Sequence, residues 1–423
     1  MSRLRSVARS TAVSALVAAL PLLAPAPSHA AAVPSPWAGA TLTRASVAAD
    51  GSQATADSFF SSISGTGRYV ALRTNARNLF PGYDTGQLTV LKDRQTGKIT
   101  PVSVRPDGTP SVGGQLIRTS ISGDGRYVAF CSMARDLVDG LPPYVFVIRV
   151  FVRDMLTGTT TVASFDENNQ PFTLDASPAS LSADGRSVAF IVGGKVYVRD
   201  LAAGKTVKAS VPASGQGEMT GDFGFPALSA DGRKVAFAQN VPYQGSTVFV
   251  RDLTAKTTTI ASVNSAGGTV VANQDSPVLS ADGRYVAFAT GASDAKVQVY
   301  RRDLLTHTTV RVSVNRYGAA GDDASTAPGI SADGRYVVFT SLADDLITGD
   351  TDTLPDLYVR DLDAGTTTRV TTTVDGLPPT QVSPYLQGFV SYDGRSVLFE
   401  SRAANLVPYD TNGAEDVFVA DAR

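Results

Sequence analysis

Histidine, cysteine and tryptophan are almost absent from this sequence of 423 residues, which contains two histidines, one cysteine and one tryptophan. His29 lies in the N-terminal segment, and His307 lies between two expected outer strands, where we interpret it as a turn residue. The single cysteine, Cys131, cannot form an intramolecular disulfide, and the apolar run around it indicates a buried side chain. These scarcities exclude Ser-His-Asp triads and zinc sites built on several histidines.

Concentrated positive charge is missing as well. Lys and Arg total 37 against 39 Asp and Glu, which gives a formal net charge of −2, and the basic residues form no cluster. A chain with this balance is a poor nucleic-acid binder, because the neutralisation of phosphates needs concentrated Lys and Arg. We therefore expect no nucleic-acid partner.

Long apolar runs are also lacking beyond the N-terminal segment. There, three arginines precede an apolar stretch at 12–23 that is too short to span a bilayer comfortably, and a small-x-small cleavage site ends at Ala30. We expect residues 1–30 to be a secretory signal peptide. Residues 31–423 would then be a soluble monomer without a membrane span, secreted to the extracellular space or associated with the cell envelope.

What the chain does contain is a nine-residue motif repeated seven times. Its consensus is Ser-x-Asp-Gly-Arg-x-Val-Ala-Phe, and the copies begin at Ser64, Ser122, Ser182, Ser229, Ser280, Ser331 and Ser391. The spacing ranges from 47 residues (182 to 229) to 60 residues (122 to 182). Self-similarity at this period is typical of repeat architectures.

Each repeat predicts four short strands. In the copy around Asp282, the Asp-Gly pair supplies the positive φ of a tight turn between strands at 276–280 and 285–289. A third strand is expected at 297–300 and a fourth at 309–314. The second strand is apolar at consecutive positions, as in a sheet that is covered on both faces. We therefore predict an all-β fold, a seven-bladed β-propeller of four-stranded antiparallel blades.

The seventh repeat ends after three strands, and its missing strand is found at the other end of the sequence. Residues 41–47 match residues 367–371, which form the expected fourth strand of the sixth repeat. We expect this N-terminal strand to complete blade 7, which removes the open sheet edges. The propeller is thus predicted to comprise residues 31–423.

The repeated motif, together with Val-Tyr-Val-Arg-Asp-Leu-x-x-Gly at 196–204, resembles the PD40, or WD40-like, repeats of TolB-type β-propellers. The resemblance covers essentially the whole chain after residue 30 and implies the propeller fold. The resemblance to TolB itself is incomplete, because TolB has a six-bladed ring and an extra N-terminal domain, whereas this chain has seven repeats. The resemblance therefore does not imply TolB's role in envelope transport. Related propellers precede the catalytic domain of prolyl-oligopeptidase-like enzymes, but the chain has no Gly-x-Ser-x-Gly motif.

We interpret the repeated Asp-Gly-Arg turn as structural. A catalytic group is needed once, whereas a turn is needed in every blade. The Asp is expected to cap the turn, and the Arg is expected to form ion pairs between blades.

Two loops that precede third strands are rich in side-chain oxygens and suggest calcium, the only cofactor that the sequence indicates. The residues are Asp350, Asp352 and Asp356 in blade 6 and Asp410, Asn412 and Asp416 in blade 7. This spacing can present hard oxygens to Ca²⁺, with carbonyls and waters completing six to eight ligands. The alternative is an Asx-turn, in which the side chains bond their own backbone.

Four further acids stand just ahead of expected first strands: Asp175, Asp222, Asp275 and Asp323. In a propeller the first strand lines the central channel, so these carboxylates are expected near one channel mouth. There they would attract a cation, a basic peptide or an amino sugar. The alternative is that each caps a strand start and faces water.

These features favour a secreted, non-catalytic scaffold that binds an envelope or extracellular protein or glycan through one face, and they identify no catalytic residue. The alternative is an extracellular polysaccharide hydrolase or lyase that uses acidic residues in the central channel, since two carboxylates suffice for glycoside hydrolysis. A purely structural wall component is a third possibility. Recognition tends to lie on variable loops, which points to the long loops at 342–355 and 403–415.

Overall fold

The computed structural model describes most of the chain from Ser35 onward, and every structural statement below concerns those residues. They are 35–82, 87–111, 115–141, 146–214, 217–219, 221–241, 245–264, 267–271, 276–291, 296–373, 379, 381, 383 and 386–423. The expected signal peptide and Asp275 lie outside them.

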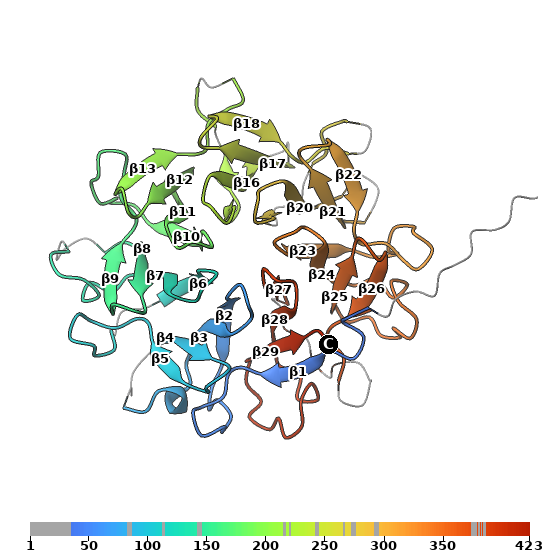
Figure 1. Ribbon diagram of the computed structural model, residues 1–423, viewed down its shortest axis with the longest axis horizontal. Helices are drawn as coiled ribbons and strands as arrows, with labels where there is room; N and C mark the ends of the chain where they lie inside the picture. The colour runs from blue at the N-terminus through green and yellow to red at the C-terminus, as the bar shows by residue number, and fades with distance from the viewer. Residues whose placement is uncertain are drawn as a thin grey trace, which may run out of the picture. The chain divides into compact units, whose positions relative to one another are not determined.

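Seven antiparallel sheets form a ring around a central channel, and each sheet is one blade (Figure 1). Within a blade the chain runs outward, so that the first strand is innermost and the fourth is outermost. This arrangement confirms the predicted seven-bladed β-propeller.

The first three blades each contain four consecutive strands. Blade 1 is formed by β2 (Ser58–Ile63), β3 (Tyr69–Thr74), β4 (Leu88–Asp93) and β5 (Ile99–Pro101). Blade 2 is formed by β6 (Gln115–Ile121), β7 (Tyr127–Ser132), β8 (Arg149–Asp154) and β9 (Thr159–Val162). Blade 3 is formed by β10 (Ala176–Leu181), β11 (Ser187–Val192), β12 (Lys195–Asp200) and β13 (Lys205–Lys208).

Blades 4 to 6 repeat the plan with small variations. In blade 4, β14 (Asp222–Phe223) and β15 (Ala227–Leu228) both pair with β16 (Lys234–Val241), which is followed by β17 (Gly245–Asp252) and β18 (Thr257–Ile260). Blade 5 is formed by β19 (Val278–Leu279), β20 (Tyr285–Thr290), β21 (Gln298–Asp303) and β22 (Thr308–Arg311). Blade 6 is formed by β23 (Ser325–Ile330), β24 (Tyr336–Ser341), β25 (Asp356–Asp361) and β26 (Thr366–Arg369).

Blade 7 combines the two ends of the chain, as predicted. Its strands are β27 (Phe389–Val390), β28 (Ser396–Ser401), β29 (Asp416–Asp421) and β1 (Thr41–Arg44). Strand β1 pairs antiparallel with β29, with Thr41 opposite Asp421 and Arg44 opposite Phe418. The only helix in the described part of the chain is the short 3-10 turn η1 (Arg77–Leu79), and no helix there is long and apolar enough to cross a bilayer.

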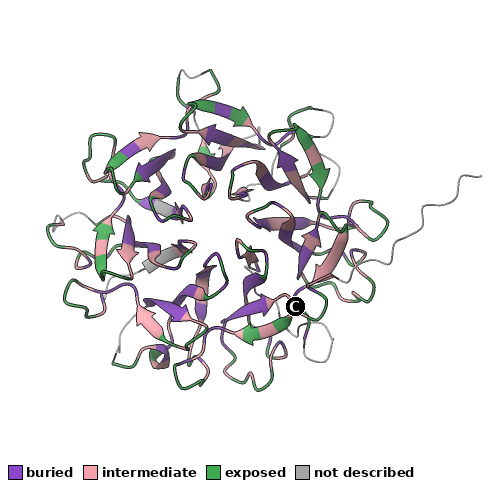
Figure 2. Cartoon of the chain, viewed as in Figure 1, coloured by how far each residue is buried: buried purple, intermediate pink, exposed green. Residues whose placement is uncertain are grey.

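The hydrophobic core lies between neighbouring blades. The Phe that ends the repeated motif is at most 1% exposed in six blades, as Phe130, Phe190, Phe237, Phe288, Phe339 and Phe399. One cluster joins Ala71 and Leu91 of blade 1 to Val128 and Phe130 of blade 2. Buried residues accordingly concentrate on the second and third strands of the blades, and exposed residues on the outermost strands and loops (Figure 2).

The Asp-Gly-Arg turns have the predicted Asp caps. In six of the seven turns the Asp Oδ1 accepts hydrogen bonds from the hydroxyl of the motif Ser and from the backbone N–H of the Arg. In blade 2, for example, Asp124 Oδ1 lies 2.6 Å from Ser122 Oγ and 2.9 Å from the nitrogen of Arg126. The other five caps are Asp184, Asp231, Asp282, Asp333 and Asp393.

The expectation that the turn arginines pair between blades is wrong for four of them. Their carboxylate partner is the Asp that ends the third strand of the same blade. The four pairs are Arg68–Asp93, Arg126–Asp154, Arg284–Asp303 and Arg335–Asp361. The reason is the antiparallel register: Tyr127, which follows Arg126, stands opposite Asp154.

A closed ring of seven backbone hydrogen bonds joins the turns of adjacent blades. In every bond the acceptor is the carbonyl oxygen of the residue that follows the motif Ser. The donor is the N–H of the equivalent residue in five bonds and the N–H of the motif Asp in two, and the bonded atoms lie 2.8 to 3.2 Å apart. The bonds are Gly65 N–Gly123 O, Gly123 N–Ala183 O, Asp184 N–Ala230 O, Ala230 N–Ala281 O, Ala281 N–Ala332 O, Ala332 N–Tyr392 O and Asp393 N–Gly65 O. Each blade is thereby held to both of its neighbours at one end of the channel.

Substitution of the single tryptophan, Trp37, can test whether the N-terminal segment closes the ring. Trp37 is 2% exposed, packs edge-on against Tyr336 at 6.3 Å between ring centroids, and lies in the core shared by blades 6 and 7. Truncation of a buried aromatic side chain leaves a cavity, so Trp37→Ala should lower the free energy of unfolding by about 3–5 kcal/mol in denaturant titrations. Tyr409→Ala is the control, because Tyr409 is 90% exposed and should change stability by less than about 0.5 kcal/mol. Equal stability of the two variants would contradict closure by this segment.

Candidate functional site

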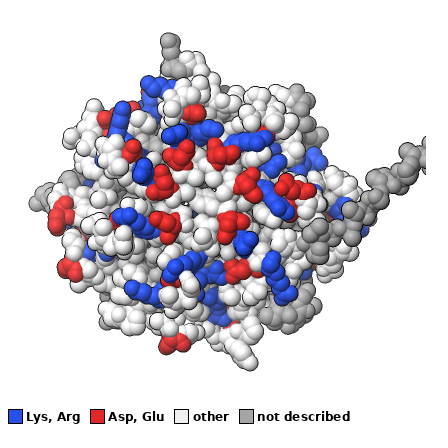
Figure 3. Space-filling model, in the orientation of Figure 1, with Lys and Arg blue, Asp and Glu red and all other residues white. Residues whose placement is uncertain are grey.

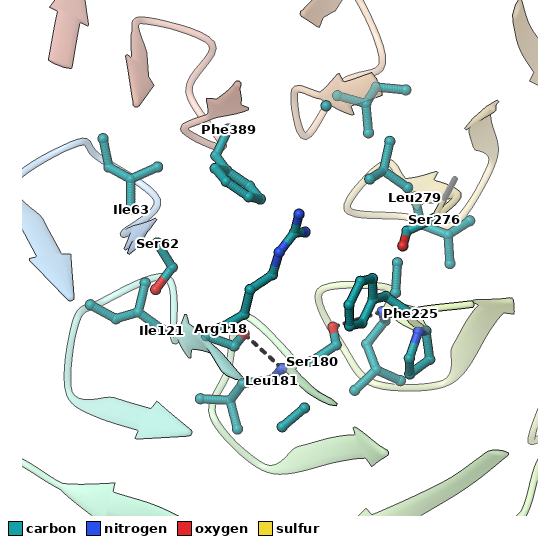
Figure 4. Close-up of a pocket in the computed structure, with 18 of the residues that line it drawn as sticks. Ser62, Ile63, Arg118, Ile121, Ser180, Leu181, Phe225, Ser276, Leu279 and Phe389 are labelled. Atoms are coloured by element: carbon teal, nitrogen blue, oxygen red, sulfur yellow. Dashed lines mark hydrogen bonds between the residues drawn. The ribbon is translucent and has the colours of Figure 1, made fainter. Parts of the chain in front are cut away.

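A cavity of about 220 Å³ lies within the central channel, between the inner strands (Figure 4). One part of its wall is polar and the other part is apolar. The difference lies in the residue that each blade carries two positions before the motif Ser. Blades 1 to 3 place a hydroxyl there, whereas blades 4 to 7 place Ala, Val, Gly and Phe. These lining residues are Ser62, Ser120, Ser180, Ala227, Val278, Gly329 and Phe389.

The hydroxyls of the polar wall also join the blades. Ser120 Oγ accepts a hydrogen bond from the N–H of Leu181 at 2.9 Å, and Ser180 Oγ accepts one from the N–H of Leu228 at 3.3 Å. Ser62 Oγ lies 2.9 Å from the hydroxyl of Thr119. Because each contact crosses to the next blade, the polar wall is held rigidly.

Arg118 is the one charged side chain among the described residues that line the cavity. Strand β6 carries a bulge between Ile117 and Ser120, and bulges re-aim side chains at such positions. Figure 4 shows the Arg118 side chain extending across the channel from blade 2 toward Phe389. Its guanidinium carbon lies 5.0 Å from the ring centroid of Phe225 and 5.3 Å from that of Phe389, and the group hydrogen-bonds to Gln387.

One bulky side chain, Tyr392, narrows the end of the channel at the turns. The residue after the motif Ser is Gly or Ala in the other six blades and Tyr in blade 7. The Tyr392 ring packs over two of these small residues, since a Cβ added to Gly65 would lie 3.0 Å from it and one on Gly123 3.5 Å. Burial raises the pKa of Tyr392 to about 12.

Of the four acids predicted to surround a channel mouth, the three that the structure describes, Asp175, Asp222 and Asp323, do not line this cavity. Asp175 is exposed and accepts a hydrogen bond from the N–H of Ile148 in the preceding blade, at 2.7 Å. Asp323 forms an ion pair with Lys296 at 2.9 Å, and Asp222 is exposed at the start of β14. Asp175 thus contacts the backbone just before β8, and Asp323 also accepts a hydrogen bond from the N–H of Ala324 just before β23. More broadly, acidic and basic side chains are interspersed on the face drawn in Figure 3.

The oxygen-rich loop of blade 6 brings its three acids together. One carboxylate oxygen from each of Asp350, Asp352 and Asp356 lies within 4.8 Å of the others. Asp356 is fully buried, forms an ion pair with Arg369 at 3.1 Å and accepts a hydrogen bond from Thr371. Burial raises the pKa of Asp356 to about 6, although Thr371 and Arg369 oppose the shift.

The corresponding loop of blade 7 has a similar arrangement. Asp410 and Asp416 lie 3.6 and 3.5 Å from the guanidinium of Arg44, which comes from β1. The Asn412 amide donates a hydrogen bond to Asp416 Oδ2 at 2.9 Å. Burial raises the pKa values of Asp410 and Asp416.

The long loops between second and third strands are more alike than we inferred from the sequence. In blades 1, 2, 6 and 7 each begins with an Ala and a Leu three residues later, and both are at most 6% exposed. These pairs are Ala76 and Leu79, Ala134 and Leu137, Ala343 and Leu346, and Ala403 and Leu406. A strand-end hydroxyl accepts a hydrogen bond from the N–H of each Ala. The first part of each loop is therefore a fixed structural element.

Two predictions about scarce residues are confirmed. Cys131 is fully buried, and burial raises its thiol pKa to about 12, which makes it unreactive. His307 is exposed in a turn with φ of 58°, at the position where Gly158, Gly204 and Gly365 stand in other blades. It lines no cavity among those described.

No protein-family model and no curated protein sequence matches the chain. Among solved structures, an oligogalacturonate lyase in complex with manganese is similar with a TM-score of 0.56 and 15% identity, covering 91% of this chain and 94% of that one. The β-propeller domain of the Trilobed protease from Pyrococcus furiosus gives 0.53 and 12% identity, with 87% and 94% covered. TolB from Acinetobacter baumannii gives 0.44 and 15%, with 81% and 78% covered.

At these identities the likeness concerns the fold alone. The chain is a β-propeller of seven four-stranded blades with a mixed polar and apolar cavity in its channel.

The half-buried Tyr392 predicts a specific loss of stability at alkaline pH. Its folded-state pKa of about 12 exceeds the ordinary value of about 10, so from pH 10 upward the unfolded chain releases this proton while the folded chain retains it. Stability should therefore fall with rising pH, by up to about 1.4 kcal/mol per pH unit from this group. In denaturant titrations between pH 10 and 12, Tyr392→Phe should lose less stability than the natural protein, whereas Tyr409→Phe should lose as much. Equal slopes for Tyr392→Phe and the natural protein would refute the assignment.

Proposed function

We propose that this protein is an exported, non-catalytic scaffold that binds an extracellular or envelope partner at its central channel. The observation that carries the proposal is the channel cavity, in which one guanidinium is held between two phenyl rings in a wall of hydroxyl and aliphatic groups. Export rests on the basic and apolar N-terminal segment of the sequence and its cleavage site at Ala30.

The cavity favours an anionic group attached to an apolar one. Arg118 offers a planar cation with parallel donors, the geometry that suits a carboxylate. Its aromatic neighbours and Ile63, Ile121 and Leu279 would bury an adjoining aliphatic or aromatic segment. At about 220 Å³ the cavity is smaller than the usual pocket for a whole small-molecule ligand, so only the end or a side chain of a larger partner would enter.

A protein partner fits these properties better than a glycan. An acidic side chain or a terminal carboxylate next to apolar residues supplies both groups that the cavity would bind. A neutral sugar ring would offer no negative charge to the Arg118 guanidinium, whereas a carboxylate would form a charge-assisted hydrogen bond with it.

The alternative function, a polysaccharide hydrolase or lyase acting through channel acids, receives less support. Glycoside hydrolysis of the usual kind needs two carboxylates on either side of the scissile bond. The described residues that line the cavity include no Asp or Glu, and Asp175 and Asp323 are engaged at strand ends.

The proposal predicts a partner whose capture depends on Arg118. The protein is immobilised and exposed to a secreted and envelope extract, and the retained partner is purified and titrated against the natural protein and two variants. Arg118→Ala should weaken binding by at least about 30-fold, or ~2 kcal/mol, because it removes one member of a buried charge pair. Arg186→Ala, which removes an exposed guanidinium outside the cavity, should bind like the natural protein.

Two results would reject this function. One is a partner that binds Arg118→Ala and the natural protein equally well. The other is turnover: release of new reducing ends or unsaturated products from secreted polysaccharide, at a rate proportional to protein concentration, would favour the enzyme instead.

A further inference from the structure

We infer that the blade 6 loop binds one Ca²⁺ through Asp350, Asp352 and Asp356, and that in blade 7 the side-chain amide of Asn412 takes the place of the ion. The inference is narrower than the expectation from sequence, in which both loops were calcium candidates. It does not rest on the proposed function.

The two loops are structural counterparts, which makes their differences informative. In each, an Asp opens the third strand opposite a Ser that closes the second, Asp356 opposite Ser341 and Asp416 opposite Ser401. Each of these Asp residues forms an ion pair with an arginine of the outermost strand and accepts a hydrogen bond from a hydroxyl two residues further on. The partners are Arg369 and Thr371 in blade 6 and Arg44 and Ser46 in blade 7.

Blade 7 satisfies its buried oxygens with protein donors. Asp416 Oδ1 accepts a hydrogen bond from Ser46 at 2.5 Å, and Oδ2 accepts one from the Asn412 amide at 2.9 Å. The same amide nitrogen also donates to the carbonyl oxygen of Ala54 at 3.0 Å. The Asn412 side chain thus bridges the carboxylate and the backbone.

Blade 6 has a carboxylate, Asp352, where blade 7 has that amide. Its Oδ2 is completely buried and receives no hydrogen bond. Asp350 Oδ1 is also buried and receives no hydrogen bond, and the Asp350 side chain is only 4% exposed. The cation paired with it, Nη1 of Arg369, is 3.6 Å away, beyond hydrogen-bonding distance. Two buried carboxylate oxygens without a donor are costly unless a cation accompanies them.

The formal charges lead to the same conclusion. Three carboxylates and Arg369 leave −2 in the blade 6 loop, because −3 + 1 = −2, whereas two carboxylates and Arg44 leave −1 in blade 7. One divalent cation neutralises the blade 6 loop. All three side chains offer hard oxygen ligands, and Ca²⁺ tolerates the irregular geometry of a loop better than Mg²⁺, which demands a near-ideal octahedron.

The chain supplies reciprocal variants for the test. The protein is stripped with EGTA, and calcium binding is followed by isothermal titration calorimetry and by Tm in EGTA, in CaCl₂ and in MgCl₂. The natural protein should bind about one Ca²⁺ per chain, and calcium in excess should raise Tm by about 2–4 °C, more than magnesium does. Asp352→Asn should abolish both effects and should raise Tm in EGTA, because the new amide can donate to Asp356 as Asn412 donates to Asp416.

The reverse substitution tests the same idea from the other loop. Asn412→Asp should lower Tm in EGTA and raise the stoichiometry to about two Ca²⁺ per chain. The inference is overturned if the folded natural protein shows neither binding heat nor a calcium-dependent Tm. It is equally overturned if Asp352→Asn binds calcium as the natural protein does. Because Asp352→Asn is expected to be more stable in EGTA, its loss of binding cannot be attributed to unfolding.

Discussion

The structure depends on the burial of both faces of each blade by its neighbours. The three-residue segment that follows each turn, Val-Ala-Phe in blades 2 to 5 and equally apolar in the others, is apolar at successive positions, so its side chains leave the sheet on both sides. A single blade would expose one such face to water, and a row of blades would expose one at each end. Only a closed ring covers all of them, which explains why the final blade takes its outermost strand from the opposite end of the chain.

Ring closure also determines what the channel can contain. The inner strands converge, and the backbone hydrogen bonds between turns fix their separation, so the residues near the axis must be small or few. The residue that follows the motif Ser is a small Gly or Ala in six blades. Their small size leaves room for the ring of Tyr392, which stands at this position in blade 7. Arg118 occupies the channel in the same way, as a single long side chain that reaches across from one blade to two others.

The features that every repeat shares could be predicted from the sequence, and the features that occur once mostly could not. The turns and the strand order follow from patterns that recur in seven repeats and therefore stand out from chance. The pairing of β1 with β29 follows from the one strand that the seventh repeat lacks. Arg118 occupies an ordinary strand position, and only the bulge in β6 directs it into the channel, which no local pattern in the sequence reveals. Tyr392 was visible as the one bulky residue among seven aligned copies, but its significance depends on how close the turns approach one another. The ion-pair partners of the turn arginines could not be predicted, because the spacing of residues in the sequence does not show which strand end lies beside each turn.

The pairing of β1 with β29 has a consequence for how the protein forms. Thr43 and Val419, whose atoms are hydrogen-bonded in blade 7, are 376 residues apart in the sequence. During synthesis β1, which completes the ring, is made before the other described strands, and its partner β29 is made after them. Six blades can therefore assemble progressively while the chain grows, but the final interface cannot form until β29 has been made. Contacts of such high sequence separation are slow to form, and until then two apolar blade faces remain open to other chains. The last step of folding is thus also the step at which this protein is most exposed to aggregation.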